Sequence, residues 1–248
     1  MLRPLKNLLS FLTVLPVRMD ENMLTDCARY MFLFPVIGAL IGFLAGLFGW
    51  VLLYFFLPGI VVGALVLGAL LLLTGLHHTD GLLDFGDGVM AHGTPEHKID
   101  VMHDQLTGAG GLTLGMMTLL ITALAFSQLN TNILIQSVIV VEVSAKLAMV
   151  VGAWAGKPVH KGMASSFLEV MHGKLGHARL AVAVLISLLI AVLLLWLKGA
   201  IVVLVACVAG LAMVGIAHRH FNGVTGDVLG ATNELARMVA VIALVALI

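Results

Sequence analysis

Long apolar runs separated by short polar segments divide the chain. A helix that crosses a bilayer needs about 20 mostly apolar residues. Six segments of this kind lie at about 31–57, 59–79, 107–127, 131–153, 180–197 and 199–217. A seventh, at about 234–248, is shorter and becomes continuously apolar only from Met238 onward. This pattern predicts an all-α protein, a polytopic membrane bundle of about seven transmembrane helices.

The first residues follow a different pattern, in which basic and apolar positions alternate. A helix over residues 1–15 would place Leu5, Leu8, Leu9 and Leu12 on one face. The segment is too short and too interrupted for a cleaved secretory signal. We therefore expect residues 1–30 to form a retained interfacial segment that begins with an amphipathic surface helix.

Composition supports the membrane assignment and excludes other classes. Of the 248 residues, 61% are hydrophobic and only 10% are charged, against about 45–50% apolar residues in soluble domains. The formal net charge is zero, so no overall field favours nucleic acid. The two cysteines, Cys27 and Cys207, are far apart and suggest neither a disulfide framework nor a thiolate metal site.

The few charges are distributed unequally across the predicted membrane. With the N-terminus in the cytoplasm, 11 of the 13 Lys and Arg residues fall on the cytoplasmic side, while Lys198 lies outside and Lys146 lies within a span. All acidic residues except Glu142 lie on that same side or its boundary. We expect one catalytic domain, residues 1–248, in the cytoplasmic (inner) membrane, with cytoplasmic active-face segments at 80–106, 154–179 and 218–233. This asymmetry favours an enzyme over a channel or transporter.

Three aspartates stand at the end of the second apolar run. Asp80, Asp84 and Asp87 have the spacing i, i+4, i+7, which on a helix gives a stripe about 60° wide. Three acids could simply end a span in water, but like charges at this spacing repel and favour a bound cation. Hard anionic oxygens favour Mg²⁺, or alternatively Mn²⁺. Zinc bound by His77 and His78 is a poor rival, because adjacent helical residues point about 100° apart.

A short cytoplasmic helix is predicted next. Thr94 suits its N-cap and Pro95 its first position. Asp104, just before a glycine-rich turn, is a better candidate than Asp100 for a fourth metal ligand or for positioning the nucleophile. His103 is either a base or a solvated surface histidine.

Charged residues inside a predicted span form a further candidate. Glu142 and Lys146 are spaced i, i+4 on one face of an apolar segment, and ionised groups in lipid pair with one another or face a cavity. They form either a structural ion pair or a polar patch that reaches toward substrate. In the second case Lys146 would reach a phosphate by snorkelling.

Two cytoplasmic segments complete the candidates. The loop 154–179 carries Lys157 and Lys161 among glycines and histidines; its charges either reflect orientation alone or form an anion-binding lid. Residues 218–234 combine Arg219, Thr225 and Asp227 with three glycines. That composition indicates a loop that cradles phosphate or supports a metal.

These motifs together resemble the cobalamin synthase family, the adenosylcobinamide-GDP ribazoletransferases. The resemblance rests on residues 11–16, 75–88, 102–104 with Gly108, and 223–234, and it covers nearly the whole length. The chain departs from the family pattern at Thr74 and Asn222, where glycines are expected, and at Lys146, where many members have arginine. The acidic residues are unaffected by these departures.

The resemblance implies a reaction and a set of roles. The adenosylcobinamide phosphate of adenosylcobinamide-GDP would pass to α-ribazole or its 5′-phosphate, releasing GMP and forming adenosylcobalamin or its 5′-phosphate. Mg²⁺ or Mn²⁺ would be held by Asp80, Asp84 and Asp87, with Asp104 as the remaining ligand or as the base. The residues expected to contact or position substrate are His77, Lys146, Lys157, Lys161, Arg219, Thr225, Asp227 and Glu234.

The resemblance leaves some partners open and has two rivals. Beyond the substrates and the lipid bilayer, it allows a homo-oligomer and association with other enzymes of cobalamin assembly. CDP-alcohol phosphotransferases also carry aspartates on membrane helices, but their Asp-Gly-x-x-Ala-Arg motif is absent, since Asp84 stands where Ala would be. A cation-coupled transporter would use Glu142 and the aspartates as an ion path.

Overall fold

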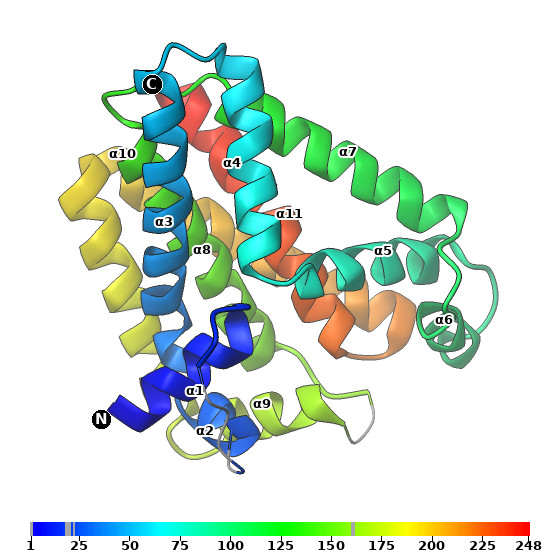
Figure 1. Ribbon diagram of the computed structural model, residues 1–248. Coiled ribbons are helices and arrows are strands. Elements are labelled where there is room, and N and C mark those ends of the chain that lie inside the picture. Colours follow the sequence, from blue (N-terminus) through cyan, green and yellow to red (C-terminus); the bar gives the residue numbers. More distant parts are fainter. Residues whose placement is uncertain (1, 18–20, 22, 160–161) are drawn as a thin grey trace.

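The computed structural model describes residues 2–17, 21, 23–159 and 162–248, and this part of the chain is helical with no strand longer than an isolated bridge. The helices are α1 (Leu2–Leu12), α2 (Met23–Arg29), η1 (Met31–Leu33), α3 (Phe34–Tyr54), α4 (Gly59–Leu73), α5 (His77–Met90), α6 (Pro95–Met102), α7 (Ala109–Phe126), α8 (Leu134–Ala155), α9 (Met163–His172), α10 (Gly176–Phe221) and α11 (Gly226–Leu247). Figure 1 shows α8 inside the bundle, with α3 and α10 beside it.

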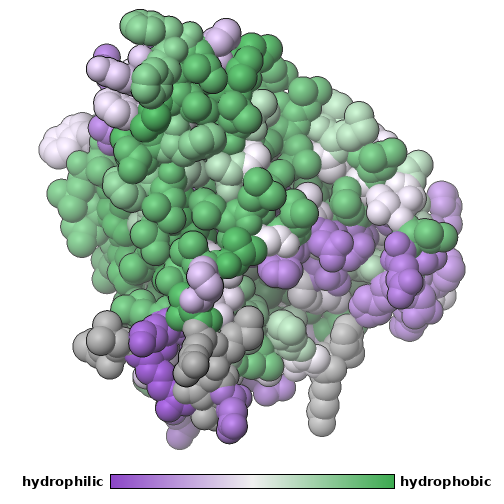
Figure 2. Space-filling view, in the orientation of Figure 1, coloured by the Kyte–Doolittle hydropathy of each residue, from purple (hydrophilic) through white to green (hydrophobic). Residues whose placement is uncertain are grey.

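Several helices are suited to a bilayer, which confirms the predicted polytopic helical bundle. Among the described residues, five are long and apolar enough to cross a membrane, and α4 with α5 make a sixth if that bent pair counts as one span. Figure 2 shows apolar surface over the flank formed by α3, α4 and α7, with hydrophilic surface gathered near α6 and at the α2 end. The protein is therefore an integral membrane protein.

The longest helix, α10, is a hairpin and not a single rod. Its backbone breaks at Trp196, where φ is 55° and ψ is −138°. A methyl group placed on Gly199 would contact the carbonyl oxygen of Ala191, a residue that would be far away along a straight helix. The two arms correspond to the predicted spans 180–197 and 199–217.

The second predicted span ends earlier than expected. Residues 59–79 were predicted to form one helix, but α4 ends at Leu73 and α5 leaves at 97° to it. The N–H of Leu76 donates to Leu71 O (3.0 Å) and that of Gly75 to Leu72 O (3.1 Å), which is a Schellman ending with glycine in the left-handed conformation. The φ of Gly75 is 63°. Helix α5 therefore runs across the bundle and does not continue the crossing of α4 (Figure 1).

Glycines let α3 pack closely against α8. A methyl group on Gly42 would lie 2.7 Å from Cα of Ile139, and one on Gly46 would lie 3.0 Å from Cα of Ile135. Helices in lipid associate through such small residues because apolar burial gives little driving force there. Gly42 and Gly46 therefore set the close contact of α3 with α8.

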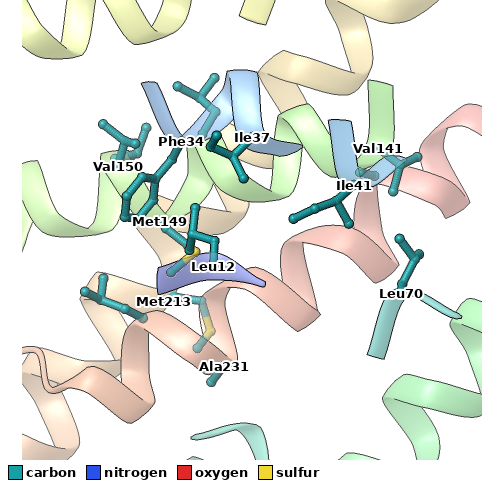
Figure 3. Close-up of a cluster of buried hydrophobic side chains, with 14 of the residues drawn as sticks. Leu12, Phe34, Ile37, Ile41, Leu70, Val141, Met149, Val150, Met213 and Ala231 are labelled. Carbon is teal, nitrogen blue, oxygen red and sulfur yellow. The ribbon is translucent and has the colours of Figure 1, made fainter. Parts of the chain in front are cut away.

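The predicted amphipathic N-terminal helix forms as α1 and docks on the bundle. Leu8 and Leu12 are buried, and Figure 3 shows Leu12 in one apolar cluster with Phe34 and Met149. The N–H of Val14 donates to the carbonyl of Leu73 (2.9 Å). The start of the chain is therefore attached to the end of α4, next to the bend that leads into α5.

The segment 218–234, predicted to be a loop, is mostly helical, which corrects its secondary structure. Helix α10 continues to Phe221 and α11 begins at Gly226, so only residues 222–225 connect them. Gly230, one of the glycines that suggested a loop, serves helix packing, because a methyl group there would lie 3.3 Å from Cα of His78. The last span is consequently 22 residues long, longer than the predicted 234–248.

Candidate functional site

The aspartate stripe lies on α5, between α7 and the start of α11. The predicted helix is confirmed, because α5 contains Asp80, Asp84 and Asp87 in regular helical geometry. Two glycines permit the close approach on either side. A methyl group on Gly81 would lie 2.9 Å from Cα of Asp227, and one on Gly86 would lie 2.9 Å from Cα of Gly111.

This packing adds Asp227 to the three predicted acids, so that four carboxylates influence one another. The pKa of Asp84 is raised from 3.8 to about 7, first by burial and then by the negative charges of Asp80, Asp227 and Asp87. Asp80 is exposed and the other three are half-buried. We call these four residues the carboxylate group. It is a site where negative charge accumulates at a water-accessible surface, which is favourable for a cation.

Asp87 also has a structural partner that the sequence did not reveal. Its carboxylate accepts the N–H of Gly108 (2.7 Å) and of Gly111 (2.8 Å). These donors are at the start of α7, which has no cap from its own N-cap side chain. Asp87 thus caps α7 from a neighbouring helix, where a carboxylate also interacts favourably with the helix dipole.

The oxygen ligands of the carboxylate group suit a hard divalent cation, but their side chains do not converge on one point. Within the described part of the chain, no three His, Cys, Asp or Glu side chains converge closely enough to hold a metal by themselves. Mg²⁺ does not require such a cage, because it commonly binds one or two carboxylates together with waters and substrate phosphates. The carboxylates of Asp80, Asp84 and Asp227, unlike that of Asp87, do not accept N–H groups from the start of α7.

Asp104 is not among the charges that raise the pKa of Asp84. It follows α6, whose predicted start is confirmed by the N–H of His97 donating to Thr94 Oγ1 (3.4 Å). The Asp104 side chain is exposed and accepts the N–H of Leu106 (3.1 Å). We therefore do not count Asp104 in the carboxylate group, and its role as a metal ligand or base stays a prediction.

The loop 222–225 brings the last predicted motif to the site. Thr225 caps α11 by accepting the N–H of Val228 (3.3 Å), and its hydroxyl is 3.4 Å from a carboxylate oxygen of Asp227. The N–H of Val224 donates to Lys157 O (2.7 Å), which ties the residues just after α8 to this loop. A small cavity of about 100 Å³ between them is lined by His103, Ser165, Thr225 and Asp227.

The predicted basic residues differ in what the structure shows of them. Lys157 and Arg219 are exposed, Lys157 beside Val224 and Arg219 in the last turn of α10. His77 is exposed at the start of α5. Lys161, also predicted to bind substrate, lies outside the described residues.

A larger cavity opens on the other side of Asp227. Its volume is about 390 Å³, within the range of small-molecule sites. The walls come from α1, α2, α3, α8, α9 and α11 and are mainly Phe, Met and Leu side chains, while His77, His78 and Asp227 line its polar end. The cavity and the carboxylate group therefore share Asp227.

Charged residues inside the bundle form a separate, dry network. Arg237 donates to both Glu142 and Glu234, and Lys146 Nζ donates to Asn233 Oδ1 (2.6 Å) and lies 3.9 Å from Glu142. These ionic side chains are 0–1% exposed. The negative charges of the two glutamates are balanced by the positive charges of Arg237 and Lys146, because ionised groups that are buried must be paired.

This network changes the setting of two predicted substrate residues. Lys146 does not snorkel to the surface, and of the two alternatives for Glu142 and Lys146 the structure shows the buried ion pair. Glu234 is likewise enclosed, held by Arg237. Arg237 is itself fully buried. Its spacing i, i+3 from Glu234 was the one local signal of pairing.

Two site features were missed from the sequence. His78 was considered only as a poor zinc ligand, yet it is 7% exposed and its Nδ1 has no hydrogen-bond partner within the described structure. The 390 Å³ cavity is lined by residues from both ends of the chain, and no local pattern in the sequence predicts it.

Comparison with known proteins places this site in a family. The model of the family described as cobalamin-5-phosphate synthase matches residues 4–245. Three proteins named adenosylcobinamide-GDP ribazoletransferase are similar: that of Methanococcoides burtonii is 31% identical, that of Methanocella arvoryzae 34% and that of Halorubrum lacusprofundi 35%. The matches cover 96–97% of this chain and 90–95% of those proteins. No solved structure matches the chain. The chain belongs to the cobalamin-5-phosphate synthase family.

Proposed function

We propose that this protein is an adenosylcobinamide-GDP ribazoletransferase that works at the carboxylate group. A hydroxyl oxygen of α-ribazole, or of its 5′-phosphate, bonds to the phosphorus attached to cobinamide. The bond from that phosphorus to the oxygen shared with GMP breaks, and GMP leaves with that oxygen. The hydroxyl proton passes to a carboxylate of the group. The product is adenosylcobalamin or its 5′-phosphate.

The observation that carries this proposal is the carboxylate group itself, at the crossing of α5 and α11. Phosphoryl transfer depends on positioning and on neutralising the charge of the phosphates, more than on covalent catalysis. A diphosphate cannot approach four unscreened carboxylates, so a cation between them is required. The pKa of Asp84 is raised first by burial, and the negative charges of Asp80, Asp227 and Asp87 raise it further.

The cation we propose is Mg²⁺, with Mn²⁺ as the alternative. Asp80, Asp84 and Asp227 would hold it, and Asp87 would reinforce their field while it caps α7. When bound, it would neutralise the diphosphate and stabilise the leaving GMP. Lys157 and Arg219, which flank the loop 222–225, would hold phosphate oxygens on the other side.

The same proposal fixes an orientation. The carboxylate group, Lys157 and Arg219 would face the cytoplasm of the cell, across the inner membrane from Lys198. This agrees with the excess of Lys and Arg on one side of the predicted spans.

The test is release of GMP by the purified protein. Protein in detergent is incubated with adenosylcobinamide-GDP, α-ribazole and Mg²⁺, and GMP and the corrinoid product are separated by chromatography. We expect GMP release that needs both substrates and that stops when EDTA removes the cation. No release with Mg²⁺ or Mn²⁺ would refute the activity, whereas release that persists in EDTA would refute only the role of the cation.

A further inference from the structure

We propose that the 390 Å³ cavity between α1, α3, α8, α9 and α11 is the subsite for the base of α-ribazole, and that His78 selects this base by a hydrogen bond. We call this cavity the base pocket. The inference rests on the proposed function, because it assigns one of the two substrates to a place beside the carboxylate group.

The walls of the base pocket suit a flat apolar ring. Phe11, Phe34 and Phe167 all line it, with ring centroids 5.4 Å apart for Phe11 and Phe167 and 6.0 Å apart for Phe34 and Phe167. Methionines complete the walls, and their flexible side chains adapt to aromatic ligands. The base of α-ribazole is a dimethylbenzimidazole, a bicyclic ring with two methyl groups and no exocyclic donor.

The polar end of the pocket fixes the direction in which a nucleoside would enter. Gly226 and Asp227 lie at this end, and Asp227 belongs to the carboxylate group. With the base among the phenylalanines, the ribose hydroxyls would therefore point toward the carboxylates. This is the direction that attack on the cobinamide phosphate requires.

We assign the polar contact to the base to His78. The two hydroxyl groups of the wall are engaged: Thr74 Oγ1 donates to Leu70 O (3.0 Å) and Ser10 Oγ to Val17 O (3.4 Å). Of the other polar residues in the wall, His77 is exposed and Asp227 belongs to the carboxylate group. His78 Nδ1 is enclosed and has no partner within the described structure. A buried polar nitrogen without a partner costs free energy. The unsubstituted ring nitrogen of the benzimidazole is an acceptor, and rotation of the His78 ring, which lines the pocket, would present its Nδ1–H to this acceptor.

The size of the pocket separates the two substrates. A volume of 390 Å³ accommodates a nucleoside, whereas a corrin macrocycle with its amide side chains is far larger. The corrinoid must therefore stay outside the pocket. The diphosphate then approaches the carboxylate group from the exposed side, where Asp80 lies.

The first experiment measures binding without turnover. Equilibrium dialysis of the purified full-length protein with radiolabelled α-ribazole, without adenosylcobinamide-GDP, gives Kd. Ala164→Phe fills the pocket from its wall, and Ala178→Phe adds the same side chain at an exposed position of α10 as the control. We expect Ala164→Phe to raise Kd at least about tenfold and Ala178→Phe to leave it unchanged.

Selectivity tests the hydrogen bond. Adenosine carries an exocyclic amine that the pocket would bury unpaired, so we expect it to bind at least about tenfold more weakly than α-ribazole. His78→Phe should raise Kd for α-ribazole about fivefold, the equivalent of one neutral hydrogen bond, while His78→Gln, which keeps a donor, should restore most of the affinity. In turnover, His78→Phe should raise KM for α-ribazole with little change in kcat.

The outcomes distinguish this inference from the proposed function. If GMP is released but Ala164→Phe changes neither Kd nor KM for α-ribazole, the base pocket is refuted and the activity stands. Equal loss of affinity in Ala178→Phe, or equal binding of adenosine, would also refute it. If no GMP is released and α-ribazole still binds in a manner sensitive to Ala164→Phe, the pocket stands and the activity fails. Displacement of a copurified lipid by Ala164→Phe, with α-ribazole binding intact, would show an acyl-chain pocket instead.

Discussion

Replacement of Asp84 by asparagine should stabilise the cation-free protein while it removes activity. The asparagine side chain would keep the shape of the aspartate and remove the charge that Asp80, Asp87 and Asp227 oppose. The gain depends on pH, because the pKa of Asp84 is about 7 in the folded protein and 3.8 ordinarily. Between pH 3.8 and about 7, Asp84 is ionised in the unfolded chain but keeps its proton in the folded protein. The free energy of unfolding therefore falls as pH rises through this range. The full destabilisation by the Asp84 charge is present above pH 7.

The size of this penalty follows from the two pKa values. At about 1.36 kcal/mol per pH unit, the change from 3.8 to about 7 corresponds to an upper limit of about 4 kcal/mol. Water reaches the half-buried Asp84 and screens its neighbours, so we expect about 1–2 kcal/mol. Asp84→Asn should therefore unfold a few degrees higher than the wild type at pH 8 in EDTA, and at the same temperature near pH 4.

The assay is thermal unfolding in detergent, followed by tryptophan fluorescence. Asp100→Asn, which removes one exposed carboxylate from α6, is the matched control and should change little. Added Mg²⁺ should raise the unfolding temperature of the wild type at pH 8 and leave Asp84→Asn unaffected, while GMP release is lost in the variant. If Asp84→Asn unfolds lower than the wild type at pH 8 in EDTA, the carboxylate group does not carry uncompensated charge.

Three further outcomes are expected. Asp87→Asn should lower stability in EDTA by about 1 kcal/mol, opposite in sign to Asp84→Asn, because it weakens the α7 cap; equal signs in thermal unfolding would contradict this. Arg237→Met should cost about 3–5 kcal/mol, because it removes the ionic partner of buried Glu234 and leaves Glu142 with Lys146 alone, and adding Glu142→Gln should recover part of the loss of folded protein measured by size-exclusion chromatography. A single cysteine at Lys157, in a cysteine-free background, should react with a membrane-impermeant maleimide in inside-out vesicles; labelling only in intact cells would reverse the proposed orientation.

The helices were predictable where local pattern determines them. Apolar length located the spans, and Thr94 with Pro95 located the start of α6. The bend after α4 also had a local signal in Gly75, which ends that helix in the left-handed conformation. The apolar run nevertheless continues to Leu76, beyond the end of α4. Hydropathy alone does not show where one helix ends and the next begins in a different direction.

The site was predictable only in part, because tertiary partners decide the rest. The stripe on α5 follows from helical spacing, but the contact of Gly81 with Asp227 joins segments that are far apart in the sequence. The cap that Asp87 provides to α7 is likewise invisible without the fold. The prediction of a loop over residues 218–234 was wrong outside residues 222–225, because small residues favour turns in water, whereas inside a membrane bundle they favour close helix contacts.

The bend between α4 and α5 explains how this fold serves a reaction between water-soluble groups at a membrane. Had α4 continued straight through residue 79, the aspartates would have projected from the end of a span, with neighbours on one side only. The 97° turn instead lays α5 across the start of α11 and the start of α7. One face of a single helix thereby acquires Asp227 from α11, while Asp87 caps α7. Because α11 also forms a wall of the 390 Å³ cavity, the same crossing sets charged and apolar surfaces side by side, as a transfer from a diphosphate to an aromatic nucleoside requires.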